Sequence, residues 1–266
     1  MFRIFLVTII LFCNHVFAEE IIEPVSAKKA LIYLPFQSDF DSDVGNIILA
    51  LLPNFTVTVI SNKDVIVNVG GRDQVFPAVN FDLQILENYI LKLNEYDFIY
   101  FDSHANLEMI SLGIPAPNKN LCKKPSSYSI ECELFGNTIG RMYIDSNRED
   151  FYSTQRIQGE DHFVSYSMTP SFFTDNFTGE NKFRNTIFVS DTCSNTEGDF
   201  PEVLTSDEVG ISLFTGWEGT IYNEDIYRTT FPFLQKMMNG DTSKEAIKDI
   251  ITDVRSEEHT SELQSH

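Results

Sequence analysis

A short apolar segment that ends in small polar residues occurs in the sequence TIFVSDTC, residues 186–193. Its apolar residues are β-branched or aromatic, and they stop before Asp191 and Cys193, which predicts a buried parallel strand followed by a loop. Ligands of open α/β sheets bind beside the carboxyl ends of the strands. Cys193 is therefore a candidate functional residue.

A second segment of the same kind is FIYFDSH, residues 98–104, which ends on His104. A thiol and an imidazole at the ends of two core strands are the minimum components of a cysteine nucleophile with its base. His162 follows an acidic turn and is interpreted as a solvated surface residue. His104 is therefore the better candidate for the base.

The two ends of the chain differ from its middle. Residues 1–18 combine Arg3 with an apolar run and a small-residue cleavage pattern, which predicts a signal peptide and a secreted or periplasmic protein. Residues 255–266 lack apolar periodicity and are similar to the translation of a common sequencing adapter, so we expect a non-native tail. The interval 19–254 is long enough for one α/β domain. No apolar run is long enough for a membrane span.

The charge of the chain limits the partners that it can attract. The formal net charge is −20, which disfavours nucleic acid and anionic membrane surfaces. A peptide or protein substrate remains compatible with this charge. The sequence leaves the oligomeric state open.

Three cysteines remain after the predicted signal peptide. Cys122 and Cys132 are close in the sequence, so a disulfide between them is the simplest pairing in an oxidising compartment. Cys193 would then be a free thiol. A free thiol can be a buried small apolar residue, but the polar neighbours of Cys193 favour a reactive role.

The spacing of Asp39, Asp41 and Asp43 is similar to that of a calcium loop. The glycine comes one position late, and alanine occupies the twelfth position, where such loops have glutamate. Helix capping is the preferred interpretation. We expect no metal and no cofactor.

The remaining pattern alternates strands and helices. Apolar runs at residues 30–34 and 56–60 and a helical pattern at 81–93 precede the histidine strand. A long, irregular insertion with small antiparallel strands is expected at about 115–182. A further strand at 210–217 ends on Trp217, and a helix is expected at 224–238. This order predicts an α/β three-layer sandwich with a mostly parallel central sheet.

These features resemble the caspase-like fold of the clan of cysteine peptidases that includes clostripain, gingipains, legumain and caspases, and the related CHAT domains. In that clan the histidine and the cysteine follow successive core strands, as His104 and Cys193 do in this sequence. The family normally has glycine at the position of Ala105, and its histidine and cysteine are closer together in the chain. The resemblance covers roughly residues 30–254.

The resemblance implies the roles of the site residues. Cys193 and His104 would form a catalytic dyad for acyl transfer, and the N–H groups of Cys193 and Ala105 would form the oxyanion hole. Asp191 would line the substrate pocket, with a basic residue or asparagine preferred before the cut. Capping of the next turn is the other interpretation of Asp191, and a non-catalytic caspase-like or CHAT-like scaffold or binding module is the other interpretation of the chain.

Overall fold

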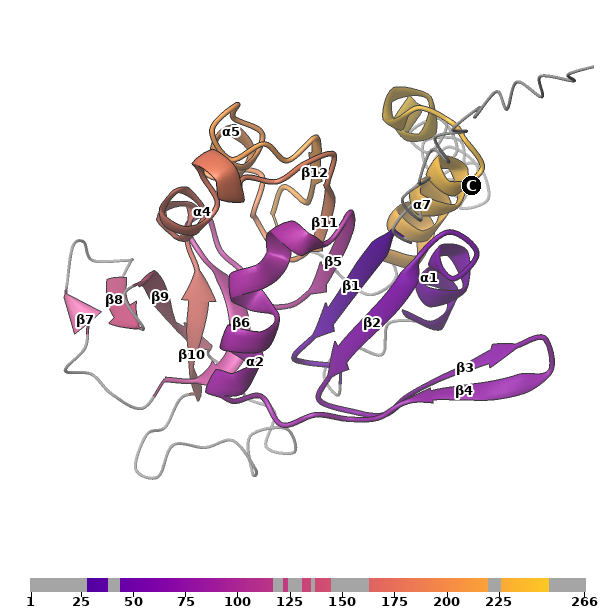
Figure 1. Ribbon diagram of the computed structural model, residues 1–266, viewed down its shortest axis with the longest axis horizontal. Helices are drawn as coiled ribbons and strands as arrows, with labels where there is room; N and C mark the ends of the chain where they lie inside the picture. The colour runs from indigo at the N-terminus through magenta and orange to yellow at the C-terminus, as the bar shows by residue number, and fades with distance from the viewer. Residues whose placement is uncertain are drawn as a thin grey trace, which may run out of the picture.

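The computed structural model describes residues 28–37, 44–116, 122–123, 131–134, 137–144, 163–219 and 226–248. These residues form an α/β fold with a central parallel sheet of five strands flanked by helices (Figure 1). The arrangement is compatible with the predicted three-layer sandwich. The predicted signal peptide, the predicted tail, His162 and the three aspartates of the candidate calcium loop lie outside the described residues.

The central sheet has the strand order β12-β11-β5-β1-β2. Its strands are β1 (Lys29–Leu34), β2 (Thr56–Ser61), β5 (Phe98–Asp102), β11 (Ile187–Asp191) and β12 (Leu213–Thr215). Along the described chain, β2 is added on one side of β1, and β5, β11 and β12 are then added in turn on the other side. The order therefore reverses between β1 and β5, and binding sites of doubly wound sheets lie at such a reversal.

One face of this sheet is covered by α1 (Val44–Leu51) and α7 (Phe231–Met238), which lie side by side in Figure 1. A π-helix, Ile226–Thr230, leads into α7. Alternate residues of each strand point to this face because successive side chains of a strand alternate. They include Ile32 of β1 and Phe98 and Tyr100 of β5.

The other face is covered by α2 (Leu83–Asn88), the 3₁₀ helix Ile90–Glu95, α4 (Pro170–Asn176) and α5 (Phe200–Leu204). The single helix expected at 81–93 is two pieces, because the backbone departs from helical geometry at Tyr89 and Lys92. Thr169 begins α4, since its side chain accepts a hydrogen bond from the N–H of Phe172.

A second, antiparallel sheet lies between β5 and β11 in the chain, where the insertion is expected. Its strands are β6 (Ile110–Pro115), β7 (Cys122–Lys123), β8 (Glu131–Leu134), β9 (Asn137–Ile144) and β10 (Phe163–Met168), in the order β6-β10-β9-β8-β7. The small antiparallel strands are present, and the first begins at Ile110, before the expected start of the insertion. Apolar residues of β6 and β10 belong to the core beside the central sheet. A 3₁₀ turn, Gly179–Asn181, follows α4.

A two-stranded hairpin of β3 (Val65–Val69) and β4 (Arg72–Phe76) extends from the body in Figure 1. Gly70 and Gly71 both have positive φ, which suits a two-residue hairpin turn. Val65 and Val67 are buried against the α1 side of the domain, while Ile66 is exposed.

A further helical segment follows α7 at residues 243–248. Thr242 is its capping residue, because the Thr242 hydroxyl oxygen accepts a hydrogen bond from the N–H of Glu245, at 3.3 Å. The Glu245 carboxylate in turn accepts the N–H of Thr242, at 3.0 Å. This reciprocal pair is a capping box.

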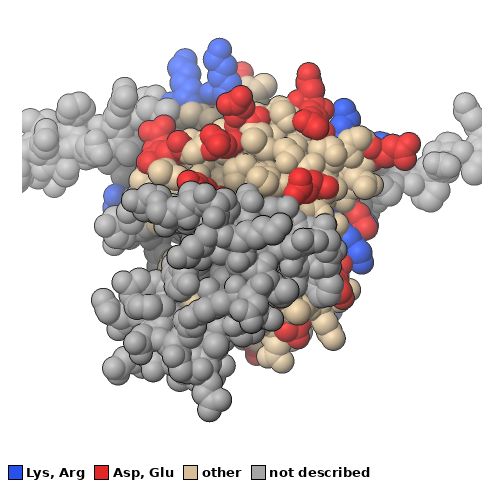
Figure 2. Space-filling model, turned by 90° about the vertical axis from the view of Figure 1, so that its left-hand side faces the viewer, with Lys and Arg blue, Asp and Glu red and all other residues tan. Residues whose placement is uncertain are grey.

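Acidic side chains are more widespread than basic ones on the described surface in Figure 2. This distribution agrees with the net charge of −20. No helix in the described part of the chain combines the length and the apolar character needed to cross a membrane.

Candidate functional site

The ends of β5 and β11 bring the two candidate catalytic residues to the same edge of the sheet. The parallel register pairs Asp102 with Asp191, and the N–H of Ser103 extends the ladder to the Asp191 carbonyl at 3.4 Å. His104 and Cys193 each follow this pair by two residues. Because neighbouring strands are about 4.8 Å apart, their backbones leave the sheet side by side.

The loops that follow these two strands are in close contact. A side chain at Gly198 would overlap the backbone carbonyl of Leu107. Leu107 lies three residues after His104, and Gly198 lies five residues after Cys193. Glycine is therefore needed at position 198 for the cysteine loop to approach the histidine loop.

The Cys193 loop is held in a defined conformation. Cys193 itself is partly exposed. Ser194 has a φ of 52°, a left-handed conformation that is uncommon for serine. The buried Asn195 donates to the Thr192 hydroxyl at 2.6 Å, and its side-chain oxygen accepts the Trp217 N–H at 3.0 Å. The loop is therefore tied to the segment that follows β12.

His104 lies against an aromatic ring from the neighbouring strand end. The ring of Phe36, which follows β1, is 4.7 Å from the imidazole in an edge-on arrangement. Phe36 is completely buried. His104 thus lies at the reversal of strand order, between the end of β1 and the end of β11.

The backbone at Ala105 is compatible with an oxyanion hole. Ala105 forms an isolated bridge with Ile110, made by hydrogen bonds between Ser111 and His104 and between Asn106 and Met109. These two bonds do not use the Ala105 N–H. Among the described non-glycine residues only Asn185 and Ser194 have positive φ, so this position does not need glycine for its backbone conformation.

Asp191 is the centre of a buried hydrogen-bond network. Its Oδ1 accepts the Trp217 indole N–H at 2.8 Å and the Thr230 hydroxyl at 2.7 Å, and its Oδ2 accepts the Tyr100 hydroxyl at 2.8 Å. The residue is only 2% exposed. The donors come from β5, from the segment after β12 and from the π-helix, so the carboxylate joins three separate parts of the chain.

Burial raises the pKa of the Asp191 carboxyl above its usual value, while hydrogen bonds from Trp217, Thr230 and Tyr100 lower it. Burial also raises the pKa of Tyr100, and the negative charges of Asp191 and Asp102 raise it further. Tyr100 therefore keeps its proton at neutral pH and remains a donor. None of the three hydrogen-bond donors is a cation, so ionising the buried Asp191 carboxyl group costs free energy.

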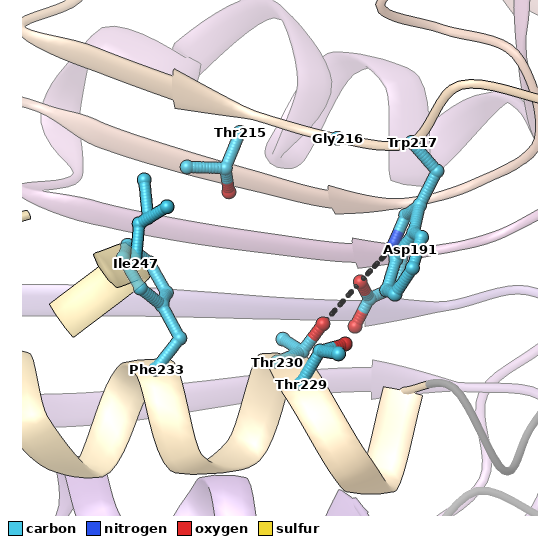
Figure 3. A pocket seen from close by; sticks show the side chains of 8 residues that line it. All are labelled: Asp191, Thr215, Gly216, Trp217, Thr229, Thr230, Phe233 and Ile247. Carbon is cyan, nitrogen blue, oxygen red and sulfur yellow. Dashed lines mark hydrogen bonds between the residues drawn. The ribbon is translucent and has the colours of Figure 1, made fainter. Parts of the chain in front are cut away.

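Asp191 also lines a pocket of about 320 Å³. Figure 3 shows this pocket between the ends of β11 and β12 on one side and the start of α7 on the other. Most of its wall is apolar or hydroxylic, and the carboxylate lies at one end beside Trp217. The lining residues are Asp191, Thr215, Gly216, Trp217, Thr229, Thr230, Phe233 and Ile247.

Sequence reasoning identified Asp191 but not its three donors. Trp217 was noticeable as the single tryptophan, at the end of an expected strand. Tyr100 occupies an ordinary core position of β5, and Thr230 lies in an amphipathic segment, so neither has a distinctive signal. Phe36 was also missed, because it follows β1 without a recognisable motif.

The two cysteines of the insertion lie opposite each other on neighbouring strands. Cys122 of β7 is paired directly with Cys132 of β8 in the antiparallel register. Directly opposed residues have Cα atoms about 4.5 to 5.5 Å apart, which is within the range of disulfides. Their disulfide stays a prediction, and Cys193 is a free thiol.

The described ranges contain no group of three or more histidine, cysteine, aspartate or glutamate side chains that could hold a metal ion.

Comparisons of the chain with protein-family models, with curated proteins and with solved structures found no match.

Proposed function

We propose that this protein is an exported cysteine endopeptidase with a caspase-like fold, in which Cys193 and His104 form the catalytic dyad. The observation that carries the proposal is the register of β5 and β11, which pairs Asp102 with Asp191. His104 and Cys193 each follow this pair by two residues, just after the ends of two adjacent strands. The contact between the Leu107 and Gly198 backbones further supports a shared site.

The proposed reaction is acyl transfer. The Cys193 thiolate attacks the scissile carbonyl and forms a thioester, while His104 protonates the leaving amine. The N–H groups of Cys193 and Ala105 stabilise the negative oxygen of the tetrahedral intermediate. A water molecule, deprotonated by His104, then hydrolyses the thioester and releases the acid product.

The pocket at Asp191 is the proposed site for the side chain before the cut. The Asp191 carboxylate accepts hydrogen bonds from Tyr100, Trp217 and Thr230. All three donors are neutral, so lysine or arginine would add the positive charge that the buried carboxylate lacks. Asparagine is the second choice, by similarity to legumain.

A mixed peptide library tests the proposal. The purified protein should cleave it in the presence of a reductant and calcium, and Cys193→Ala and His104→Ala should each abolish cleavage. Glu108→Gln is the matched control, because Glu108 is an exposed residue of the His104 loop, and this variant should cleave normally.

The proposal fails if the wild-type protein cleaves nothing under these conditions, or if Cys193→Ala cleaves as well as wild type. A non-catalytic scaffold or binding module would then be the better interpretation of the fold.

A further inference from the structure

Trp217 is attached to two parts of the site at once. Its indole N–H donates to Asp191 Oδ1 at 2.8 Å. Its backbone N–H donates to Asn195 Oδ1 at 3.0 Å, and its backbone carbonyl accepts the N–H of Thr196 at 3.4 Å. The side chain therefore binds the carboxylate at one end of the pocket, while the main chain binds the loop of Cys193.

The segment around Trp217 has little freedom to move independently of the Cys193 loop. A side chain at Gly216 would overlap the side-chain amide of Asn195. Two residues beyond Trp217, the Gly219 carbonyl accepts the N–H of Ser194 at 2.8 Å. Ser194 directly follows Cys193 and has the left-handed backbone conformation, which persists only where neighbouring contacts enforce it.

Thr230 provides an internal comparison. Its hydroxyl donates to the same oxygen of Asp191, at 2.7 Å. It belongs to the π-helix Ile226–Thr230 and lines the pocket on the side opposite Trp217 (Figure 3). Of these two donors to Oδ1, Trp217 is the one whose backbone is bonded to the Cys193 loop.

We propose that Trp217 is a positioning residue that couples the occupancy of the Asp191 pocket to the conformation of the Cys193 loop. The inference rests on the proposed function only in naming a cationic side chain as the occupant. A guanidinium or ammonium group is a stronger donor to a carboxylate than a neutral indole N–H. Such a group displaces the indole from Asp191, and the segment from Gly216 to Gly219 then holds residues 194–196 less firmly.

The test uses n-butylguanidinium as the occupant and the alkylation rate of Cys193 by iodoacetamide as the readout. Peptide mapping assigns the modified thiol, and titration calorimetry measures binding of the probe. In the wild type, saturating probe should raise the alkylation rate about five-fold, the effect of losing one ordinary hydrogen bond. Alkylation requires only a thiol, so this readout remains valid even if the protein hydrolyses no peptide.

Two variants distinguish coupling between the Asp191 pocket and the Cys193 loop from mere binding of the probe in the pocket. Trp217→Phe keeps an aromatic ring but removes the indole N–H. In this variant Cys193 should be alkylated fast without the probe, and the alkylation rate should change less than about two-fold when the probe binds. Thr230→Val removes the other donor to the same oxygen, and it should retain the five-fold response.

Three results would overturn the proposal. The first is no calorimetric binding of the probe to the wild type. The second is an equal response of Trp217→Phe and Thr230→Val. The third is slower alkylation in all three proteins, which would mean that the probe blocks the thiol and leaves the loop where it is.

Discussion

Replacing Tyr100 with phenylalanine should have a pH-dependent effect on stability. The Tyr100 hydroxyl donates to Asp191 at 2.8 Å, and both side chains are buried. A hydrogen bond to a charged group contributes about 1.5 to 3 kcal/mol, and one between neutral groups about 0.5 to 1.5 kcal/mol. We therefore expect Tyr100→Phe to lower the free energy of unfolding by about 2 kcal/mol at pH 7.5 and by about 1 kcal/mol at acid pH.

The sign follows from the pKa of Asp191. The folded-state pKa is raised above the unfolded value of 3.8, mainly by burial. Between these two pKa values the folded state binds more protons than the unfolded state, so the contribution of Asp191 to stability falls as the pH rises through this window. Removing the Tyr100 donor raises the pKa of Asp191 in the folded state further, so the pH range between the folded and unfolded pKa values becomes wider. The variant therefore loses the most stability relative to the wild type at a pH where Asp191 is ionised.

Tyr33→Phe is the matched control. Tyr33 is also completely buried, but its hydroxyl donates to the neutral carbonyl of Leu112 at 2.6 Å. Its loss should cost about 1 kcal/mol at every pH. Urea unfolding of the wild type and both variants between pH 4 and pH 8 measures the differences, and the net charge of the molecule cancels in the comparison. A Tyr100→Phe effect that is constant with pH, or a Tyr33→Phe effect that varies in the same way, would refute the reasoning.

Two further predictions concern the insertion and the contact between the loops. Mapping of non-reduced peptides should find Cys122 linked to Cys132, and reduction should cost roughly 2 to 3 kcal/mol for so short a loop; a bridge from either cysteine to Cys193 would contradict the pairing and remove the nucleophile. Gly198→Ala should lower the free energy of unfolding by about 1 to 3 kcal/mol, because the new methyl group would overlap the Leu107 carbonyl; a change below about 0.5 kcal/mol would argue against this close approach.

The central sheet could be predicted because its strands are short apolar runs that stop at polar residues. Residues 30–34, 56–60 and 98–102 were located within one or two residues of the observed strands. The strand expected at 210–217 is shorter, Leu213–Thr215, for a local reason. Gly210 has a φ of 86°, and the N–H of Ile211 is bonded to the Leu204 carbonyl of α5, outside the sheet.

The site was less accessible to sequence reasoning than the sheet. Cys193 and His104 could be found because each follows an apolar run and few other residues of either type remain. The hydroxyl and indole donors of Asp191 come from positions 100, 217 and 230, and nothing in local spacing relates these positions to one another. Such partners are determined by tertiary packing, in which the π-helical turn directly before α7 brings Thr230 to the carboxylate.

The composition of one face of the central sheet explains why we expect a ligand to bind at the carboxyl end of β11, beside Asp191. On the face covered by α1 and α7, β5 presents Phe98, Tyr100 and then Asp102, and β11 presents Ile187, Val189 and then Asp191. The two carboxyl groups are register partners, and each residue is only 2% exposed. Well-packed apolar residues of similar volume would often stabilise such a position as well or better. The same face carries aliphatic and aromatic residues at every earlier level of both strands, and a polar end on such a face supports the proposed recognition of a cationic group.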